Sequence, residues 1–177
     1  PPSPASAYTS TSLVRSRPVA GQHRAAHRRL AILRAVVRRV GTDELLRPYL
    51  DTVMVMEQGT DKVVDSEFYA AAQDSLGDKL RIIEQGNLGG SGGYARGQLE
   101  SVRKGTATYS LMMDDDVVCE PEGIIRAITF GDLARRPTIV GGHMFSLYAR
   151  SRMHSFGEIV QPWRFWWRSP EDSFNDW

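Results

Sequence analysis

The chain has 177 residues, of which 41% are hydrophobic and 24% are charged, and its formal net charge is +1. This near-neutral balance gives no support for nucleic acid as a partner, and the length fits one domain or a piece of a larger one. A single cysteine, Cys119, excludes an intramolecular disulfide and fits a reducing compartment. No apolar run approaches the ~20 residues of a spanning helix. Because a signal-peptide core is also missing, we expect a cytoplasmic location.

The first 42 residues contain no acidic side chain but many arginines. Proline, serine, alanine and threonine dominate its beginning, which predicts that the basic segment 1–26 is poorly ordered. From His27 to Val40, apolar residues recur at helical spacing and leave a face rich in arginine. The simpler interpretation of this helix is a solvated surface. The alternative is a peripheral contact with anionic lipid at the inner face of the plasma membrane.

Residues 27–177 are predicted to form one α/β domain in which strands and helices alternate. Strands are predicted at Thr52–Met56, Leu80–Glu84, Thr106–Met113 and Thr138–Phe145, the last interrupted by Gly141 and Gly142. Helices are predicted at Ser66–Leu76, Tyr94–Lys104 and Pro121–Leu133, with Ser66 as cap and Gly77 as stop of the first. Such alternation is typical of an open sheet flanked by helices, which binds ligands beyond the carboxyl ends of its strands.

Three consecutive carboxylates follow the third predicted strand, at Asp114, Asp115 and Asp116. Adjacent carboxylates repel each other unless a positive group lies between them, and a divalent cation is the usual remedy. Because side chains alternate along an extended chain, Asp114 and Asp116 would face one way and bind the cation. Asp115 would then accept hydrogen bonds from a ribose or sugar hydroxyl. The alternative is a solvated acidic loop or a helix N-cap.

A glycine-rich segment precedes that strand, with the sequence Asn87-Leu88-Gly89-Gly90-Ser91-Gly92-Gly93-Tyr94-Ala95-Arg96. It is neither a GxGxxG motif nor a Walker loop, since no GK[ST] follows. One interpretation is a turn that needs positive φ angles, and the other is close approach of the backbone to a nucleotide or sugar. Arg96 lies about one helical turn past the last glycine, near the predicted helix N-terminus, where an anionic ligand could bind.

The end of the chain holds an isolated acid and many aromatic residues. Glu158 stands in an apolar context next to a glycine, where a buried carboxylate would need a partner such as a sugar hydroxyl. The aromatic residues are Trp163, Phe165, Trp166, Trp167, Phe174 and Trp177. They could form part of a core or present flat faces to a sugar, and the sequence favours neither interpretation.

Taken in order, these motifs resemble the bacterial galactofuranosyltransferases, which build the galactan of the actinobacterial cell wall. The resemblance covers roughly Asp51 to Trp167. It rests on these segments in turn: Val55-Met56-Glu57-Gln58-Gly59-Thr60-Asp61-Lys62-Val63, the glycine-rich segment, Met113-Asp114-Asp115-Asp116, Val140-Gly141-Gly142-His143-Met144, and Gly157-Glu158 with the tryptophans after it. The ordered set is more specific than any single motif.

This resemblance implies a GT-A (Rossmann-like) fold with an open mixed sheet flanked by helices. It also implies inverting, metal-dependent transfer of galactofuranose from UDP-galactofuranose to a cell-wall galactan or glycolipid acceptor, with Mn²⁺ or Mg²⁺ as the cation. By the same resemblance, Asp114 and Asp116 hold the metal, Glu158 and Trp167 lie near the sugar or acceptor, and a general base takes the acceptor proton. The donor-binding candidates are Asn87, Gly89, Gly90, Arg96 and Asp115.

The chain departs from the family's pattern at both ends. Its residues Thr9 to Pro18 do not match the family's first strand, which cradles uridine, and the family's base, third metal ligand and C-terminal helices would lie beyond Trp177. We therefore expect a partial domain. Two other functions stay open, namely a nucleotide-sugar-binding remnant without catalysis and a phosphatase with Asp114 as nucleophile. The composition fits a monomer and an oligomer equally well.

Overall fold

A computed structural model of the chain describes residues 9–14, 43–60, 62–114, 117–146, 148–155 and 159–168. The chain divides into two compact units, Pro1–Thr129 and Phe130–Trp177. The predicted amphipathic helix at residues 27–40 lies outside the described residues. Within the described part, no helix is both long and apolar enough to cross a membrane.

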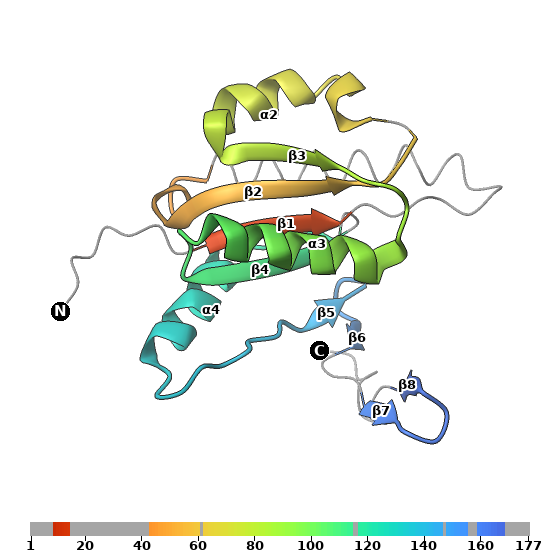
Figure 1. The fold of residues 1–177 in the computed structure, drawn as a ribbon. Coiled ribbons are helices and arrows are strands. Elements are labelled where there is room, and N and C mark those ends of the chain that lie inside the picture. Colours follow the sequence, from red (N-terminus) through yellow and green to blue (C-terminus); the bar gives the residue numbers. More distant parts are fainter. Residues whose placement is uncertain are drawn as a thin grey trace. The chain divides into compact units, whose positions relative to one another are not determined.

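The first unit contains a four-stranded sheet in the order β3-β2-β1-β4 (Figure 1). Its strands are β1 (Thr9–Val14), β2 (Leu50–Glu57), β3 (Leu80–Glu84) and β4 (Tyr109–Asp114). Each neighbouring pair of described strands is parallel. The sheet is therefore purely parallel among these strands, whereas the resemblance implied a mixed sheet. The prediction of an open α/β sheet with flanking helices is confirmed.

Strand β1 lies in the segment for which the composition predicted poor order. It pairs with β2 on one side and with β4 on the other, so that Val14 is in register with both Met56 and Asp114. Thr9–Val14 thus forms a strand inside the segment 1–26, and the expectation of poor order for that segment as a whole stays a prediction. Hydrogen bonding to two neighbouring strands satisfies the backbone of this segment, and no local pattern of residues reveals such long-range pairing.

Strand β2 is buried along almost its whole length, and its two faces pack against different helices. Val53 and Val55 belong to a core cluster that also contains residues of two helices, α2 (Tyr69–Leu76) and α4 (Pro121–Leu133). The cluster contains no residue of α3 (Gly89–Lys104). Because alternate side chains point to opposite faces, Met54 and Met56 face the other side of the sheet, which α3 covers (Figure 1).

Short 3-10 turns link these elements: η1 (Arg47–Tyr49) precedes β2, η2 (Val63–Asp65) precedes α2, and η3 (Gly77–Lys79) joins α2 to β3. Helix α2 begins three residues later than predicted, because the Ser66 hydroxyl donates to the Val63 carbonyl of η2 and does not cap the helix. Gly77 ends α2 with a φ of 55°, as its role as a stop predicts.

Helix α3 begins at Gly89, five residues before the predicted start, so the glycine-rich segment is the first part of a helix and not a turn. Gly93 and Gly97 are buried in this helix one turn apart. A glycine lets a helix backbone approach a sheet closely, which explains a composition that otherwise disfavours a helix. Only Gly89, with a φ of 68°, takes the positive φ that the turn interpretation required of this segment.

The described part of the second unit contains two short hairpins. In one, β5 (Met144–Phe145) pairs antiparallel with β6 (Met153–Ser155), and in the other β7 (Ile159–Gln161) pairs antiparallel with β8 (Trp166–Arg168). The strand predicted at Thr138–Phe145 is reduced to its last two residues. Gly141 and Gly142 favour irregular backbone, and residues 137–143 form neither helix nor strand.

Candidate functional site

The carboxyl ends of the four parallel strands share one edge of the sheet, and the predicted site residues of the first unit gather there. Strand β4 ends at Asp114, in register with Val14 of β1, while β2 and β3 end together at Glu57 and Glu84. Residues 85–88 then lead from β3 into α3. Asp114 and the start of the glycine-rich segment therefore both follow the carboxyl ends of strands in the same sheet, at the edge where open α/β sheets bind ligands.

Asp114 is the one member of the acidic triplet within the described residues, and its side chain is exposed. The Tyr94 hydroxyl, on α3, donates a hydrogen bond to Oδ1 of Asp114. Among the described residues, no donor reaches Oδ2. One carboxylate oxygen is thus held by the helix, while the other is available to an external ligand. Asp115 and Asp116 lie outside the described residues, so their predicted roles stay predictions.

Gln58 connects the end of β2 to the start of α3. Its Nε2 donates to the Gly89 carbonyl at 3.0 Å, and its Oε1 accepts from the Leu88 amide at 2.9 Å and from Gln85 Nε2 at 3.1 Å. The residue is only 5% exposed. A buried amide with this many partners fixes its surroundings, because losing one partner leaves a polar group without compensation. Gln58 therefore sets the conformation of residues 85–89.

The predicted donor-binding residues Asn87, Gly89 and Gly90 come together in this segment. Asn87 Oδ1 accepts from the Gly89 amide at 3.1 Å, and Gly89 is itself held by Gln58. All three residues are exposed. No atom lies within 4 Å of the position that a Cβ on Gly90 would occupy, so the backbone is open there. This arrangement suits the approach of a ligand to the first turn of α3.

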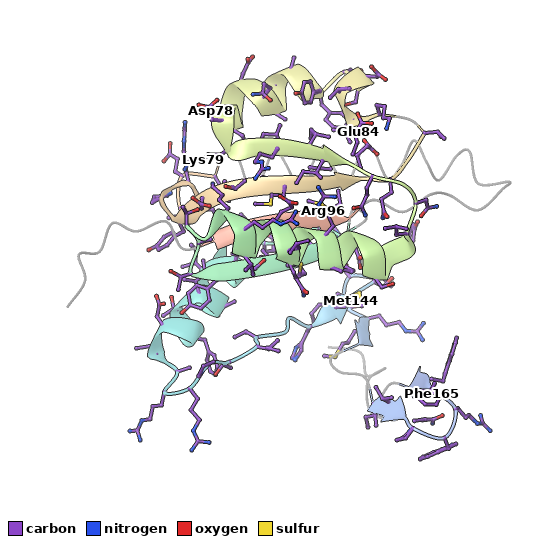
Figure 2. The ribbon with its side chains drawn as sticks, in the orientation of Figure 1. Asp78, Lys79, Glu84, Arg96, Met144 and Phe165 are labelled. Atoms are coloured by element: carbon purple, nitrogen blue, oxygen red, sulfur yellow. The ribbon has the colours of Figure 1, made fainter. Side chains whose placement is uncertain are left out.

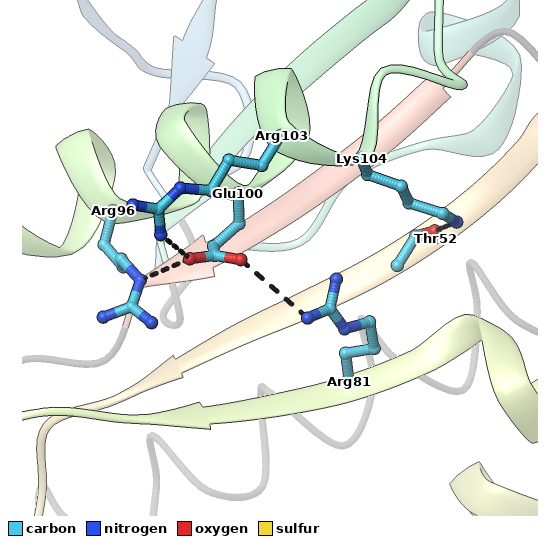
Figure 3. A network of polar contacts seen from close by, with 6 residues as sticks. All are labelled: Thr52, Arg81, Arg96, Glu100, Arg103 and Lys104. Carbon is cyan, nitrogen blue, oxygen red and sulfur yellow. Dashed lines mark hydrogen bonds and ion pairs between the residues drawn. The ribbon is translucent and has the colours of Figure 1, made fainter.

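Arg96 belongs to a network of charges on α3 and β3 (Figures 2 and 3). Its Nε donates to Glu100 Oε1 at 2.8 Å, Arg103 Nη1 donates to the same oxygen at 3.0 Å, and Arg81 Nη2 lies 3.8 Å from Oε2. The hydrogen bond from Arg96 lowers the pKa of Glu100 more than burial raises it, and Arg103 lowers it further. Arg96 thus has an intramolecular partner, and its contact with a donor stays a prediction.

Of the two predicted metal ligands, the described residues include only Asp114. They contain no group of three or more His, Cys, Asp or Glu that could hold an ion. Asp114 nevertheless fits one ligand of a hard divalent cation, since it offers an exposed oxygen at the carboxyl edge of the sheet. The second predicted ligand, Asp116, follows it by two positions.

In the second unit, the predicted sugar-side residues are only partly described. Glu158 lies outside the described residues, as does the side chain of Trp167, whose backbone forms part of β8. The neighbouring aromatic residues Trp163, Phe165 and Trp166 are 77%, 92% and 65% exposed (Figure 2 labels Phe165). These three side chains therefore do not form a core within the described part of the chain.

Two residues with a place at this edge were absent from the sequence-based candidates. Gln58 could have been suspected, because a polar side chain that directly follows a fully buried strand sits at the ligand-binding edge of a parallel sheet. Tyr94 could not, since its contact with Asp114 depends on where α3 crosses the sheet.

Comparison with known proteins identifies relatives. The chain is 38% identical over 135 residues to "Galactofuranosyltransferase GlfT2" of Mycolicibacterium smegmatis (strain ATCC 700084 / mc(2)155), a match that covers 76% of this chain. It is also 38% identical over 131 residues, or 74% of the chain, to the protein of the same name from Mycobacterium tuberculosis (strain ATCC 25618 / H37Rv). The chain is homologous to these galactofuranosyltransferases. It spans only 21% of the length of either relative, and no family model matches it.

Proposed function

We propose that the chain carries the donor site of a GT-A glycosyltransferase that transfers galactofuranose from UDP-galactofuranose to a galactan or glycolipid acceptor. Homology to two galactofuranosyltransferases supports the reaction class and the sugar. The observation that carries the site is the exposed carboxylate of Asp114, which lies at the carboxyl edge of a parallel sheet beside the start of α3. That edge is where open α/β sheets bind nucleotides.

In the proposed site, Asp114 and Asp116 hold Mn²⁺ or Mg²⁺, and a bound cation would neutralise charge on the diphosphate leaving group. Asp115, Asn87 and the open backbone at Gly89 and Gly90 bind the nucleotide-sugar. For the sugar or the acceptor, the proposed contacts are Glu158 and Trp167 of the second unit. Arg96 contributes positive charge, while Glu100 holds its guanidinium in place.

In the proposed inverting reaction, the acceptor hydroxyl attacks the anomeric carbon as the bond to the UDP oxygen breaks, and a general base takes the hydroxyl proton. The described residues supply no group that we assign to this base. The second candidate function is nucleotide-sugar binding without transfer, which the groups proposed at the sheet edge would support without a base.

The test is calorimetric titration of UDP into the protein, with and without Mn²⁺. We expect binding that requires the metal in the wild type and is abolished in Asp116→Ala. The control is Asp78→Ala, which removes the same charge from an exposed carboxylate in η3, before the amino end of β3 (Figure 2). If Asp116→Ala bound UDP and Mn²⁺ like the wild type, the proposed site would be wrong.

A second measurement separates the candidate functions. Turnover of UDP-galactofuranose with a galactan acceptor would support transfer, and metal-dependent UDP binding without turnover would support a binding remnant. Hydrolysis of simple aryl phosphates that is lost in Asp114→Asn would instead favour a phosphatase.

A further inference from the structure

The contact between Tyr94 and Asp114 joins the two motifs that make up the candidate site. Tyr94 is the sixth residue of α3 and follows directly on the glycine-rich run, whereas Asp114 is the last residue of β4. The tyrosine hydroxyl donates to one carboxylate oxygen, Oδ1. The two residues are twenty positions apart in sequence, so the contact exists only because α3 crosses over β4.

Helix α3 is held firmly enough at this point to orient the hydroxyl. Gln58 bonds to the residues on both sides of the helix start, Leu88 and Gly89. One residue before Tyr94, the buried Gly93 brings the helix close to the sheet. The tyrosine ring is itself half-buried. With the helix backbone fixed and the ring packed, the direction of the hydroxyl depends on few remaining degrees of freedom.

A carboxylate that binds a cation needs a defined orientation, because an exposed Asp side chain otherwise samples several rotamers. A hydrogen bond to the oxygen that does not bind the metal supplies that orientation, and loss of such an outer contact typically weakens metal binding by about 10- to 100-fold. Among the described residues, Asp114 fits this arrangement, since Oδ1 accepts from Tyr94 and no donor reaches Oδ2.

We propose that Tyr94 is a positioning residue that orients Asp114 for the divalent cation, leaving Oδ2 as the metal-binding oxygen. The inference rests on the proposed function, because it assumes the metal at Asp114. It adds a link that the acidic triplet alone does not contain: the glycine-rich start of α3 governs metal affinity as well as donor binding. Tyr94 touches neither metal nor substrate in this arrangement.

The experiment compares Tyr94→Phe, which removes only the hydroxyl, with Tyr69→Phe. Tyr69 is the matched control, because it is also half-buried and its hydroxyl donates to a side-chain oxygen, Gln73 Oε1 at 3.2 Å, on helix α2. Mn²⁺ affinity is measured by electron paramagnetic resonance of free Mn²⁺, UDP affinity by calorimetry over a range of Mn²⁺ concentrations, and Tm by thermal unfolding without metal.

We expect Tyr94→Phe to raise the Kd for Mn²⁺ by about 10-fold and to leave Tm within the change seen for Tyr69→Phe. Saturating Mn²⁺ should restore its UDP affinity to the wild-type value. An unchanged Mn²⁺ affinity would overturn the inference, as would a lower UDP affinity that excess Mn²⁺ cannot restore. Absence of metal-dependent UDP binding in the wild type would instead overturn the proposed function, and the inference with it.

Discussion

At the scale of single residues, the candidate site depends on polar side chains that are held by more than one neighbour. Gln58 is the clearest case, since its amide bonds to both Leu88 and Gly89 and is almost fully buried. Asp114 has a different role, because its side chain is exposed and one of its carboxylate oxygens is accessible to a ligand. The site thus combines an exposed ligand-binding group with a buried group that fixes the backbone beside it.

This arrangement makes a prediction for Gln58→Ala. The change leaves the Leu88 amide and the Gly89 carbonyl without their side-chain partner, which should lower the free energy of unfolding by about 1–3 kcal/mol. It should also weaken metal-dependent UDP binding, because residues 87–90 lose their fixed conformation. Chemical denaturation and calorimetry measure the two effects.

Gln73→Ala is the matched control for that experiment. Gln73 lies in α2, donates through Nε2 to the Gly77 carbonyl at 3.2 Å and accepts from Tyr69, so it too links side chain to backbone. We expect this variant to lose stability but to bind UDP like the wild type. If Gln58→Ala lost only stability and bound UDP normally, Gln58 would have no role in the donor site.

At the scale of elements, helix α3 shows why glycine is required within a helix. A Cβ added at Gly92 would overlap Leu88 Cβ, a fixed part of that side chain that cannot rotate away. We therefore expect Gly92→Ala to lower the free energy of unfolding by about 1–3 kcal/mol through overpacking, despite the higher helix propensity of alanine. Denaturant unfolding monitored by circular dichroism measures this change.

Helix α4 provides the control for Gly92. Gly123 is also helical, but no atom lies within 4 Å of the position of its missing Cβ. Gly123→Ala should raise the free energy of unfolding by about 0.5–1 kcal/mol, which is the propensity difference alone. If Gly92→Ala and Gly123→Ala changed the free energy of unfolding in the same direction, the result would contradict the packing that the structure assigns to the start of α3.

The elements also show how far the sequence predicts this fold. Strand β3 and helix α4 have the predicted bounds, because local signals define their ends: residues 77–79 form a turn before the strand, and Pro121 starts the helix. The candidate edge was predictable for the same reason, since both motifs follow apolar strands. Asp114 ends β4, and Asn87 and Gly89 follow β3.

Features that depend on distant partners were not predictable. Strand β1 begins with alternating threonine and serine and lacks an alternating apolar pattern, so its sequence gives only a weak strand signal, and the two neighbouring strands decide its conformation. Helix α3 begins early because Gln58, more than thirty positions away from Gly89, bonds to its first turn. The contact of Tyr94 with Asp114 likewise needs the crossing of α3 over the sheet, which periodicity does not report.

At the scale of the whole first unit, the amino edge of the sheet is closed by a second polar cluster. Asp51 Oδ2, at the start of β2, accepts from Lys104 Nζ at 2.9 Å, from Thr106 Oγ1 at 2.9 Å and from Thr52 Oγ1 at 3.0 Å. The cluster joins β2 to the end of α3 and the loop after it, so it links segments that are fifty residues apart.

Stability should depend on pH through Asp51. Burial raises the pKa of this carboxyl, but the hydrogen bonds from Lys104, Thr106 and Thr52 together lower it by more than burial raises it. The pKa of Asp51 therefore lies below the ordinary value of 3.8. A lowered folded-state pKa contributes stability that is complete above the unfolded-state pKa and is lost as pH falls through the folded-state value. Asp51→Asn should therefore cost about 1–2 kcal/mol near pH 6, and the difference should shrink below about pH 4.

Denaturation of wild type and Asp51→Asn between pH 3 and 7 measures this difference. Asp78→Asn is the control, because Asp78 is exposed and no cation of the described residues lies within ion-pair distance. A difference between Asp51→Asn and wild type that stayed constant down to pH 3 would show that the carboxylate charge does not stabilise the cluster.

The central position of β1 has a consequence for how the protein is made. Strand β1 is synthesised before its two neighbours in the sheet, β2 and β4, which begin at residues 50 and 109. During synthesis the backbone of β1 has no strand to pair with until β2 and β4 have been made. In this period an unpaired strand can form hydrogen bonds with a strand of another chain. A run of Thr9-Ser10-Thr11-Ser12 has little tendency to aggregate. The polar residues that make β1 difficult to predict as a strand thus also lower the tendency of the nascent chain to aggregate.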